Sequence, residues 1–124
     1  MDRRQRVILY IDDDPDYRLA MRQILESHGY RVIEAPDGES GLRAFREHRP
    51  DLVIVDLMME EIDSGVHFMR EVRSTDPGTP VYLMSSVGDS LTMTTNAAEL
   101  GFSGVLQKPV NGARLIAVVG SQFR

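Results

Sequence analysis

Four short apolar runs in this 124-residue chain are each followed by side chains that could do chemistry. Clustered carboxylates favour a hard cation such as Mg²⁺ or Mn²⁺, particularly where no histidine or cysteine lies among them. A lysine and a hydroxyl suit the oxygens of a phosphoryl group, and a carboxylate can itself become an aspartyl phosphate. The side chains that follow the runs are Asp12, Asp13 and Asp14, then Asp56, then Ser85 and Ser86, and finally Lys108.

The elements that must position these side chains alternate along the chain. Continuous runs rich in β-branched residues predict strands that are covered on both faces, and patterns of helical spacing lie between them. The predicted strands are 7–11, 31–34, 52–55, 81–84 and 104–106. The first predicted helix opens at Asp14 and Pro15 and stops at Gly29; the next three span 39–47, 65–73 and 90–100, and the last begins near Asn111.

A strand followed by a helix, five times over, predicts an α/β fold with a doubly wound, five-stranded parallel sheet and right-handed crossovers. In such sheets ligands bind at the carboxyl ends of the strands, near the point where the strand order reverses. Four strand ends therefore bring acids, hydroxyls and one ammonium to a single edge. Any one of these acids alone is best explained as a solvated loop residue, but the joint pattern is not. We expect one domain over 1–124.

Composition and charge exclude several classes of protein. The net charge of −5 argues against a surface that binds nucleic acid by neutralising its phosphates. The absence of cysteine excludes a disulfide framework, a thiolate zinc site and a cysteine nucleophile. The apolar run after Arg3, Arg4 and Arg6 is too short for a signal peptide, and no stretch approaches the ~18 apolar residues of a membrane span. We therefore expect a cytoplasmic protein that contacts neither nucleic acid nor membrane directly.

Five segments of the sequence together resemble the receiver domain of two-component response regulators. Each segment alone is weak, whereas their order and spacing are specific, and the resemblance covers nearly the whole chain. The segments are Ile11-Asp12-Asp13-Asp14-Pro15, Ala35-Pro36-Asp37-Gly38, PDLVIVDLMM at 50–59, PVYLMSS at 80–86, and Lys108-Pro109.

The resemblance implies a flavodoxin-like sheet with strand order 2-1-3-4-5 and a phosphorylation-dependent switch. Asp56 is then the phosphoacceptor. Asp13 binds Mg²⁺ (or Mn²⁺) directly, Asp12 binds it directly or through a water, and Asp56 and the backbone carbonyl of Met58 complete the protein ligands. The spacing leaves Ser85 and Ser86 as alternatives for the hydroxyl that lies beside the phosphoryl group.

Two further roles follow from the resemblance. Ser85 is preferred over Ser86 as the hydroxyl beside the phosphoryl group, because it lies five residues after Pro80, where relatives place that hydroxyl. Lys108 occupies the position of the family's lysine, and the bond from Lys108 to Pro109 is expected to be cis, as in relatives.

The resemblance also implies partners. A sensor histidine kinase or a phosphotransfer protein would supply the phosphoryl group from a phosphohistidine. An effector domain or a second copy of the chain would bind the face made by the predicted helix at 90–100, the last strand and the last helix. The chain ends just after that last helix, which fits either a single-domain regulator or a piece of a longer one.

The sequence departs from the family pattern in three places. Glu60 stands where relatives usually have proline, and the segment 60–65 is one residue longer. The loop after Ser85 is also one residue longer. Val105 replaces the usual tyrosine or phenylalanine, whose ring moves with the hydroxyl loop; Phe102 lies nearby, but core packing is its preferred explanation. We therefore expect phosphorylation to reorganise 87–96 instead of moving a ring.

Two other functions are weighed against the switch. An aspartyl-phosphate hydrolase typically needs a second acid two residues after the nucleophile, and Met58 stands there. A receiver-like interaction module acting without phosphorylation is disfavoured by the intact set of acids. The start of a calcium loop, Asp12-x-Asp14-x-Asp16, fails because Tyr17 takes the glycine position. We expect a self-phosphorylating acceptor with slow autodephosphorylation, because neither Met58 nor Val87 can orient a water.

Overall fold

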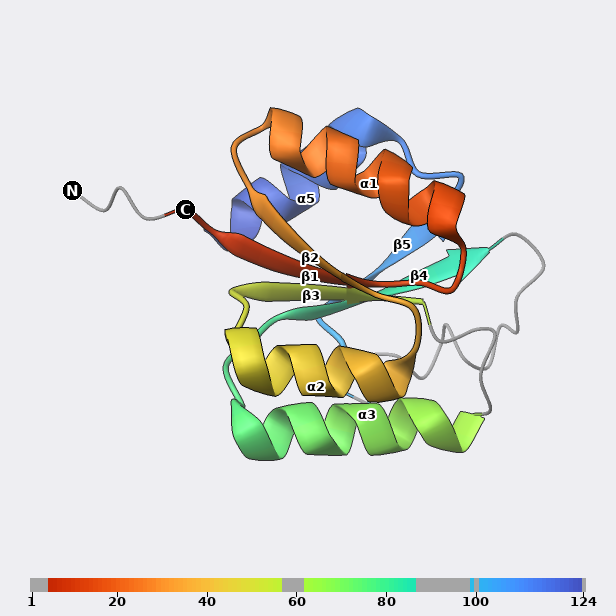
Figure 1. Ribbon diagram of the computed structural model, residues 1–124, viewed down its shortest axis with the longest axis vertical. Helices are drawn as coiled ribbons and strands as arrows, with labels where there is room; N and C mark the ends of the chain where they lie inside the picture. The colour runs from red at the N-terminus through yellow and green to blue at the C-terminus, as the bar shows by residue number, and fades with distance from the viewer. Residues whose placement is uncertain (1–4, 57–61, 87–98, 100, 124) are drawn as a thin grey trace.

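The computed structural model of the chain describes residues 5–56, 62–86, 99 and 101–123. In this part of the chain a parallel sheet of five strands has the order β2-β1-β3-β4-β5, with helices on both faces (Figure 1). Fold class and strand order are therefore confirmed. The elements are β1 Val7–Ile11, α1 Pro15–Ser27, β2 Arg31–Ala35, α2 Gly38–His48, β3 Leu52–Val55, α3 Ile62–Thr75, β4 Val81–Ser86, β5 Gly104–Lys108 and α5 Gly112–Gln122.

Two apolar layers hold the sheet between its helices. Helices α1 and α5 cover one face, and α2 and α3 cover the other (Figure 1). The strands of the central sheet are buried on both faces, as their continuous apolar sequences predict. The layer on the α1 and α5 face includes Ile8, Tyr10, Met21, Leu25, Ile54, Leu115 and Val119, and the layer on the other face includes Leu9, Ile11, Phe45, Val53, Phe68, Met69 and Val72.

Polar side chains fix where the helices begin. Asp14 caps α1, since its carboxylate accepts hydrogen bonds from the backbone N–H groups of Asp16 at 2.9 Å and Tyr17 at 3.4 Å. Pro15 occupies the first helical position, as expected. Asn111 caps α5 by accepting from the N–H of Arg114 at 3.1 Å. These caps fix the residues at which α1 and α5 begin.

The structure corrects several predicted boundaries. Ser85, Ser86 and Lys108 belong to strands rather than following them, because β4 and β5 stay paired to their ends, with Ser86 opposite Lys108. This pairing uses backbone groups and needs no apolar side chain. Helix α3 begins at Ile62, three residues before the predicted start. The helix predicted at 90–100 falls almost wholly outside the described residues. No helix that the structure describes is long and apolar enough to cross a membrane.

Candidate functional site

The carboxyl ends of the strands bring two aspartates side by side. Asp12 follows β1 and Asp56 follows β3, and these strands are neighbours in which Ile11 lies opposite Val55. The backbone N–H of Asp56 donates to the carbonyl of Ile11 at 2.8 Å, and that of Asp12 donates to the carbonyl of Ala35 at 3.0 Å. Pairing of the backbone past the strand ends therefore fixes both aspartates at the sheet edge.

Lys108 reaches the two aspartates from β5, the strand at one edge of the sheet. Its Nζ atom lies 2.8 Å from Oδ2 of Asp12 and 2.7 Å from Oδ2 of Asp56. Lys108 ends β5, which is separated from β3 by β4, so its long side chain reaches across one strand. The bond from Lys108 to Pro109 is cis, as the resemblance implied. One ammonium thus serves two carboxylates.

The two carboxylates keep the lysine charged. Burial alone lowers the pKa of the Lys108 ammonium, but the hydrogen bonds and charges of Asp12 and Asp56 outweigh burial and hold this pKa above its usual value. The ammonium is therefore present at neutral pH, between two acids that would otherwise repel each other. Such a group can offset charge that is added to either carboxylate.

Asp12 is completely buried and is held by three protein donors. Its Oδ1 accepts from the backbone N–H of Asp14 at 3.0 Å, and its Oδ2 accepts from Lys108 and from the hydroxyl of Tyr10, at 2.6 Å. Burial raises the pKa of the Tyr10 hydroxyl, and the hydrogen bond to Asp12 raises it further. Tyr10 therefore keeps its proton and acts as a donor.

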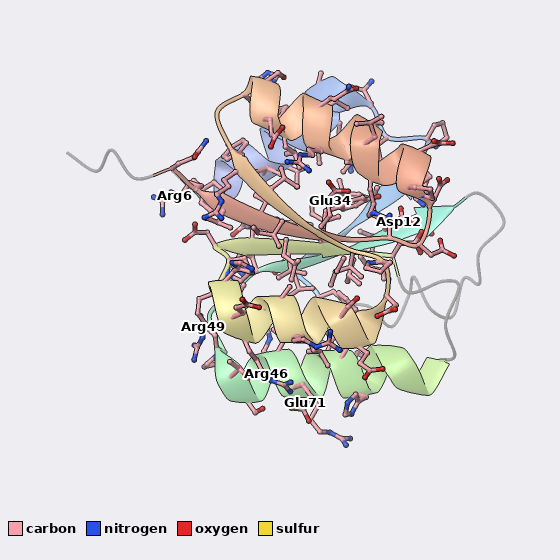
Figure 2. The ribbon with its side chains drawn as sticks, viewed as in Figure 1. Arg6, Asp12, Glu34, Arg46, Arg49 and Glu71 are labelled. Atoms are coloured by element: carbon pink, nitrogen blue, oxygen red, sulfur yellow. The ribbon has the colours of Figure 1, made fainter. Side chains whose placement is uncertain are left out.

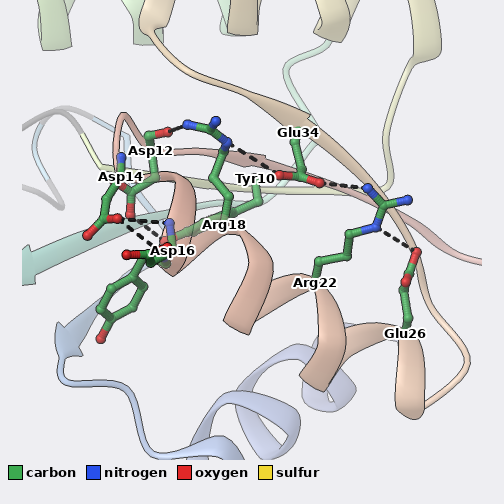
Figure 3. Close-up of polar contacts among 9 residues, drawn as sticks. Tyr10, Asp12, Asp14, Asp16, Arg18, Arg22, Glu26 and Glu34 are labelled. Carbon is green, nitrogen blue, oxygen red and sulfur yellow. Dashed lines mark hydrogen bonds and ion pairs between the residues drawn. The ribbon is translucent and has the colours of Figure 1, made fainter.

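A chain of charged side chains on α1 and β2 braces the turn after β1. Arg18 donates to the backbone carbonyl of Asp12 at 2.6 Å and lies 3.3 Å from Glu34 (Figure 3). Glu34 also binds Arg22 at 2.7 Å, and Arg22 lies 3.2 Å from Glu26. Figure 3 shows Arg18 between the carbonyl of Asp12 and Glu34. The helix is thereby tied to the acidic turn.

Tyr17 closes the site on the α1 side. The Nζ atom of Lys108 lies 4.2 Å from the centroid of the Tyr17 ring, within the range of a cation–π contact. The Tyr17 hydroxyl accepts a hydrogen bond from the backbone N–H of Val110 at 3.0 Å. One side chain of α1 therefore contacts both the ammonium and the turn that follows it.

The other predicted site residues lie around this centre. Asp13 is exposed at the turn after β1, and Ser85 is buried near the end of β4, opposite Gln107. Met58 and Val87 lie outside the described residues. In the part of the chain that the structure describes, no three acidic, histidine or cysteine side chains are grouped as ligands of one ion. The carboxylate oxygens of Asp12 and Asp56 are nevertheless the donors that Mg²⁺ prefers.

Phe102 and Val105 show how the protein packs where relatives usually have a tyrosine or phenylalanine at position 105. Phe102 is buried and packs in the layer on the α2 and α3 face, which confirms core packing as its role. Val105 is half-buried and packs against the same layer.

Sequence reasoning missed three residues that contact the site. Tyr10 lies two positions before Asp12 in an extended segment, so both side chains point to the same face of the sheet. That spacing could have predicted a contact between them. Tyr17 and Arg18 lie in the first turns of the predicted helix, next to the acids. Nothing local indicated that their side chains turn back toward Lys108 and the carbonyl of Asp12.

Comparisons with known proteins agree with this geometry. A family model described as the response regulator receiver domain matches residues 8–120. The transcriptional regulatory protein CseB of Streptomyces avermitilis is 36% identical over 120 residues, covering 97% of this chain and 50% of that protein. The chemotaxis protein CheY of Bacillus subtilis is 29% identical, covering 90% of this chain and 92% of that protein.

A solved structure shows the same fold. The response regulator receiver domain protein from Clostridium thermocellum superposes with a TM-score of 0.84 at 30% identity, covering 94% of this chain and 93% of that one. The chain spans about half the length of the first curated relatives that it matches.

Proposed function

Because the chain belongs to the family of response regulator receiver domains, we propose that it is a phosphorylation-dependent switch whose phosphoacceptor is Asp56. The observation that carries the proposal is the position of Lys108, whose ammonium lies between Asp12 and Asp56 at the carboxyl edge of the sheet. Members of this family are signalling switches rather than multi-turnover enzymes.

The proposed reaction is phosphoryl transfer from a phosphohistidine. A carboxylate oxygen of Asp56 forms a bond to phosphorus while the bond from phosphorus to the donor nitrogen breaks, and the electron pair of that bond stays on the nitrogen. Lys108 offsets the charge on the transferring oxygens, and the buried hydroxyl of Ser85, preferred over Ser86, offers them a hydrogen bond. The protein mainly supplies position and charge.

A divalent cation completes the proposed site. We propose that Mg²⁺ is held by Asp13 and Asp56, by Asp12 directly or through a water, and by the backbone carbonyl of Met58. When bound, it offsets the negative charge that collects on the phosphoryl oxygens. Tyr10 and Lys108 already donate to Oδ2 of Asp12 and the Asp14 N–H donates to Oδ1, so the remaining lone pair of Oδ1 is the one that could face the ion or its water.

The proposed partners follow from the family. A sensor histidine kinase or a phosphotransfer protein supplies the phosphoryl group in the cytoplasm. The relative CseB is named a transcriptional regulatory protein and is about twice as long as this chain, which supports an effector domain as one output. Phosphorylation is proposed to change the face of β5, α5 and residues 87–96, where an effector or a second copy binds.

Product accumulation separates this switch from a hydrolase. The protein is incubated with Mg²⁺ and acetyl phosphate, while phosphoprotein and released phosphate are both measured. A switch accumulates close to one phosphoryl group per chain and releases phosphate slowly. Rapid release of many phosphates per chain without accumulation would identify a hydrolase instead, and no phosphorylation at all would favour an interaction module.

A further inference from the structure

Tyr10 contacts Asp12, the fully buried acid of the site. Its side chain is fully buried in the layer on the α1 and α5 face. Its hydroxyl lies 2.6 Å from Oδ2 of Asp12, the same oxygen that lies 2.8 Å from Lys108. One carboxylate oxygen is therefore shared between a lysine and a tyrosine.

This sharing matters once Asp56 carries a phosphoryl group. If Lys108 turns toward the phosphoryl oxygens, its contact with Asp12 weakens. Asp12 is completely buried, and the proposed Mg²⁺ or its water would use the other oxygen, Oδ1, so bulk solvent does not replace the ammonium on Oδ2. A buried carboxylate that loses a donor pays a large desolvation cost, and this cost opposes the movement of the lysine.

We propose that Tyr10 is a positioning residue that keeps Asp12 hydrogen-bonded while Lys108 transfers to the phosphoryl group on Asp56. This inference rests on the proposed function. The hydroxyl needs no movement for the task, because it already donates to the oxygen that Lys108 leaves. Its bond to Asp12 strengthens as the lysine withdraws, since the charge of that oxygen is then shared with one donor fewer.

Removal of the hydroxyl should hold Lys108 on Asp12. In Tyr10→Phe the ring still fills the core, but within the described residues only the ammonium and the Asp14 N–H still donate to the Asp12 carboxylate. The hydrogen bond from Tyr10 to Asp12 exists before and after the lysine moves. Its loss therefore changes the affinity for the mimic only by the amount by which the bond strengthens during that movement. We therefore expect the affinity for a phosphoryl mimic to fall by about fivefold, a share of the strength of a hydrogen bond to a charged group.

The sequence offers a direct spectroscopic probe for this transfer. Lys108 is the only lysine in the chain. Protein labelled with isotopic lysine therefore gives one side-chain ammonium signal, which reports the surroundings of Lys108. Beryllofluoride with Mg²⁺ serves as the phosphoryl mimic and is titrated while this signal is followed.

Tyr82→Phe is the matched control. Tyr82 is a buried tyrosine of the same apolar layer, but its hydroxyl pairs with Gln122 at 2.5 Å, away from the acids. We expect Tyr10→Phe to need about five times more beryllofluoride than the wild type for the same displacement of the lysine signal. Tyr82→Phe should titrate like the wild type.

The outcomes separate this inference from the proposed function. If Tyr10→Phe titrates like the wild type, or if both tyrosine variants weaken equally, Tyr10 has no special role and the inference is overturned, while the switch stands. If beryllofluoride leaves the lysine signal of the wild type unmoved, the proposed function itself fails.

Discussion

The Nζ atom of Lys108 lies 2.7 Å from Oδ2 of Asp56, a residue 52 positions earlier in the chain, and 2.8 Å from Asp12, 96 positions earlier. One cation from the last strand thus pairs with the acids that follow two other strands. The contact requires the complete sheet, because β4 lies between β3 and β5. Stability and chemistry therefore depend on the same ammonium.

Lys108→Met should destabilise the metal-free protein by about 3 kcal/mol, at the low end for breaking a buried ion pair, because Tyr10 and Asp14 remain on Asp12. Urea unfolding measures this change. Arg43→Met is the control, since Arg43 is exposed and lies 3.9 Å from exposed Glu39; its loss should cost well under about 1 kcal/mol. Equal effects of the two substitutions would show that Lys108 is not a buried partner.

Asp13→Asn should weaken Mg²⁺ binding by at least about tenfold, because even indirect partners of a metal contribute that much. The fold should not change, because Asp13 is exposed. Calorimetric titration with Mg²⁺ measures the affinity. Asp16→Asn, an exposed acid one turn further on, should bind Mg²⁺ like the wild type. An unchanged affinity in Asp13→Asn would remove Asp13 from the site.

Arg18→Met should cost about 1 kcal/mol of stability, since it removes the donor to the Asp12 carbonyl. Arg46→Met is the comparison: Arg46 joins α2 to Glu71 of α3 at 3.0 Å on the surface (Figure 2). That pair lies on the opposite face of the sheet from α1. Slower phosphorylation by acetyl phosphate is expected in the Arg18 variant alone. If both variants are phosphorylated like the wild type, the brace does not position Asp12.

The Asp37 carboxyl makes part of the free energy of unfolding depend on pH. It caps α2, and hydrogen bonds from the backbone and side chain of Ser40 hold the pKa of its carboxyl below the usual 3.8. A lowered pKa gives stability that is complete above the unfolded value and is lost as the pH falls through the folded value. Asp37→Ala should therefore cost about 1 kcal/mol at pH 7.

Unfolding measurements at low pH check this role of Asp37. The difference in unfolding free energy between the wild type and Asp37→Ala should shrink below pH 3.8, where the free carboxyl is protonated. Asp37→Asn keeps a capping oxygen without a titrating group, so its stability relative to Asp37→Ala should not change with pH. A wild-type advantage that persists in strong acid would contradict the capping role.

The central strands could be predicted from sequence because they are buried on both faces. β1 and β3 have the predicted bounds, since each apolar run ends where a charged residue begins. The ends of β4 and β5 could not be predicted in this way, because Ser85, Ser86 and Lys108 are polar and join the strands through backbone pairing. A hydropathy pattern reports the burial of side chains and not the pairing of backbone groups.

The site was predictable in its acids and lysine but not in their supports. Asp12, Asp56 and Lys108 follow directly from strand ends that meet at one edge. Ala35 and Pro36, which follow the second predicted strand, offer no reactive side chain, yet the Ala35 carbonyl accepts the N–H of Asp12, and Glu34 pairs with Arg18. Those contacts depend on how β2 pairs with β1 and on how α1 packs, which no local pattern encodes.

The identity of the phosphorylated residue tests the central claim most directly. Wild type and Asp56→Asn are incubated with Mg²⁺ and acetyl phosphate, and the modified residue is mapped by mass spectrometry of peptides. We expect one phosphoryl group on Asp56 in the wild type and none in the variant, which should remain folded because Lys108 still pairs with Asp12. Phosphate on another residue of the wild type, or undiminished phosphorylation of Asp56→Asn, would contradict the account.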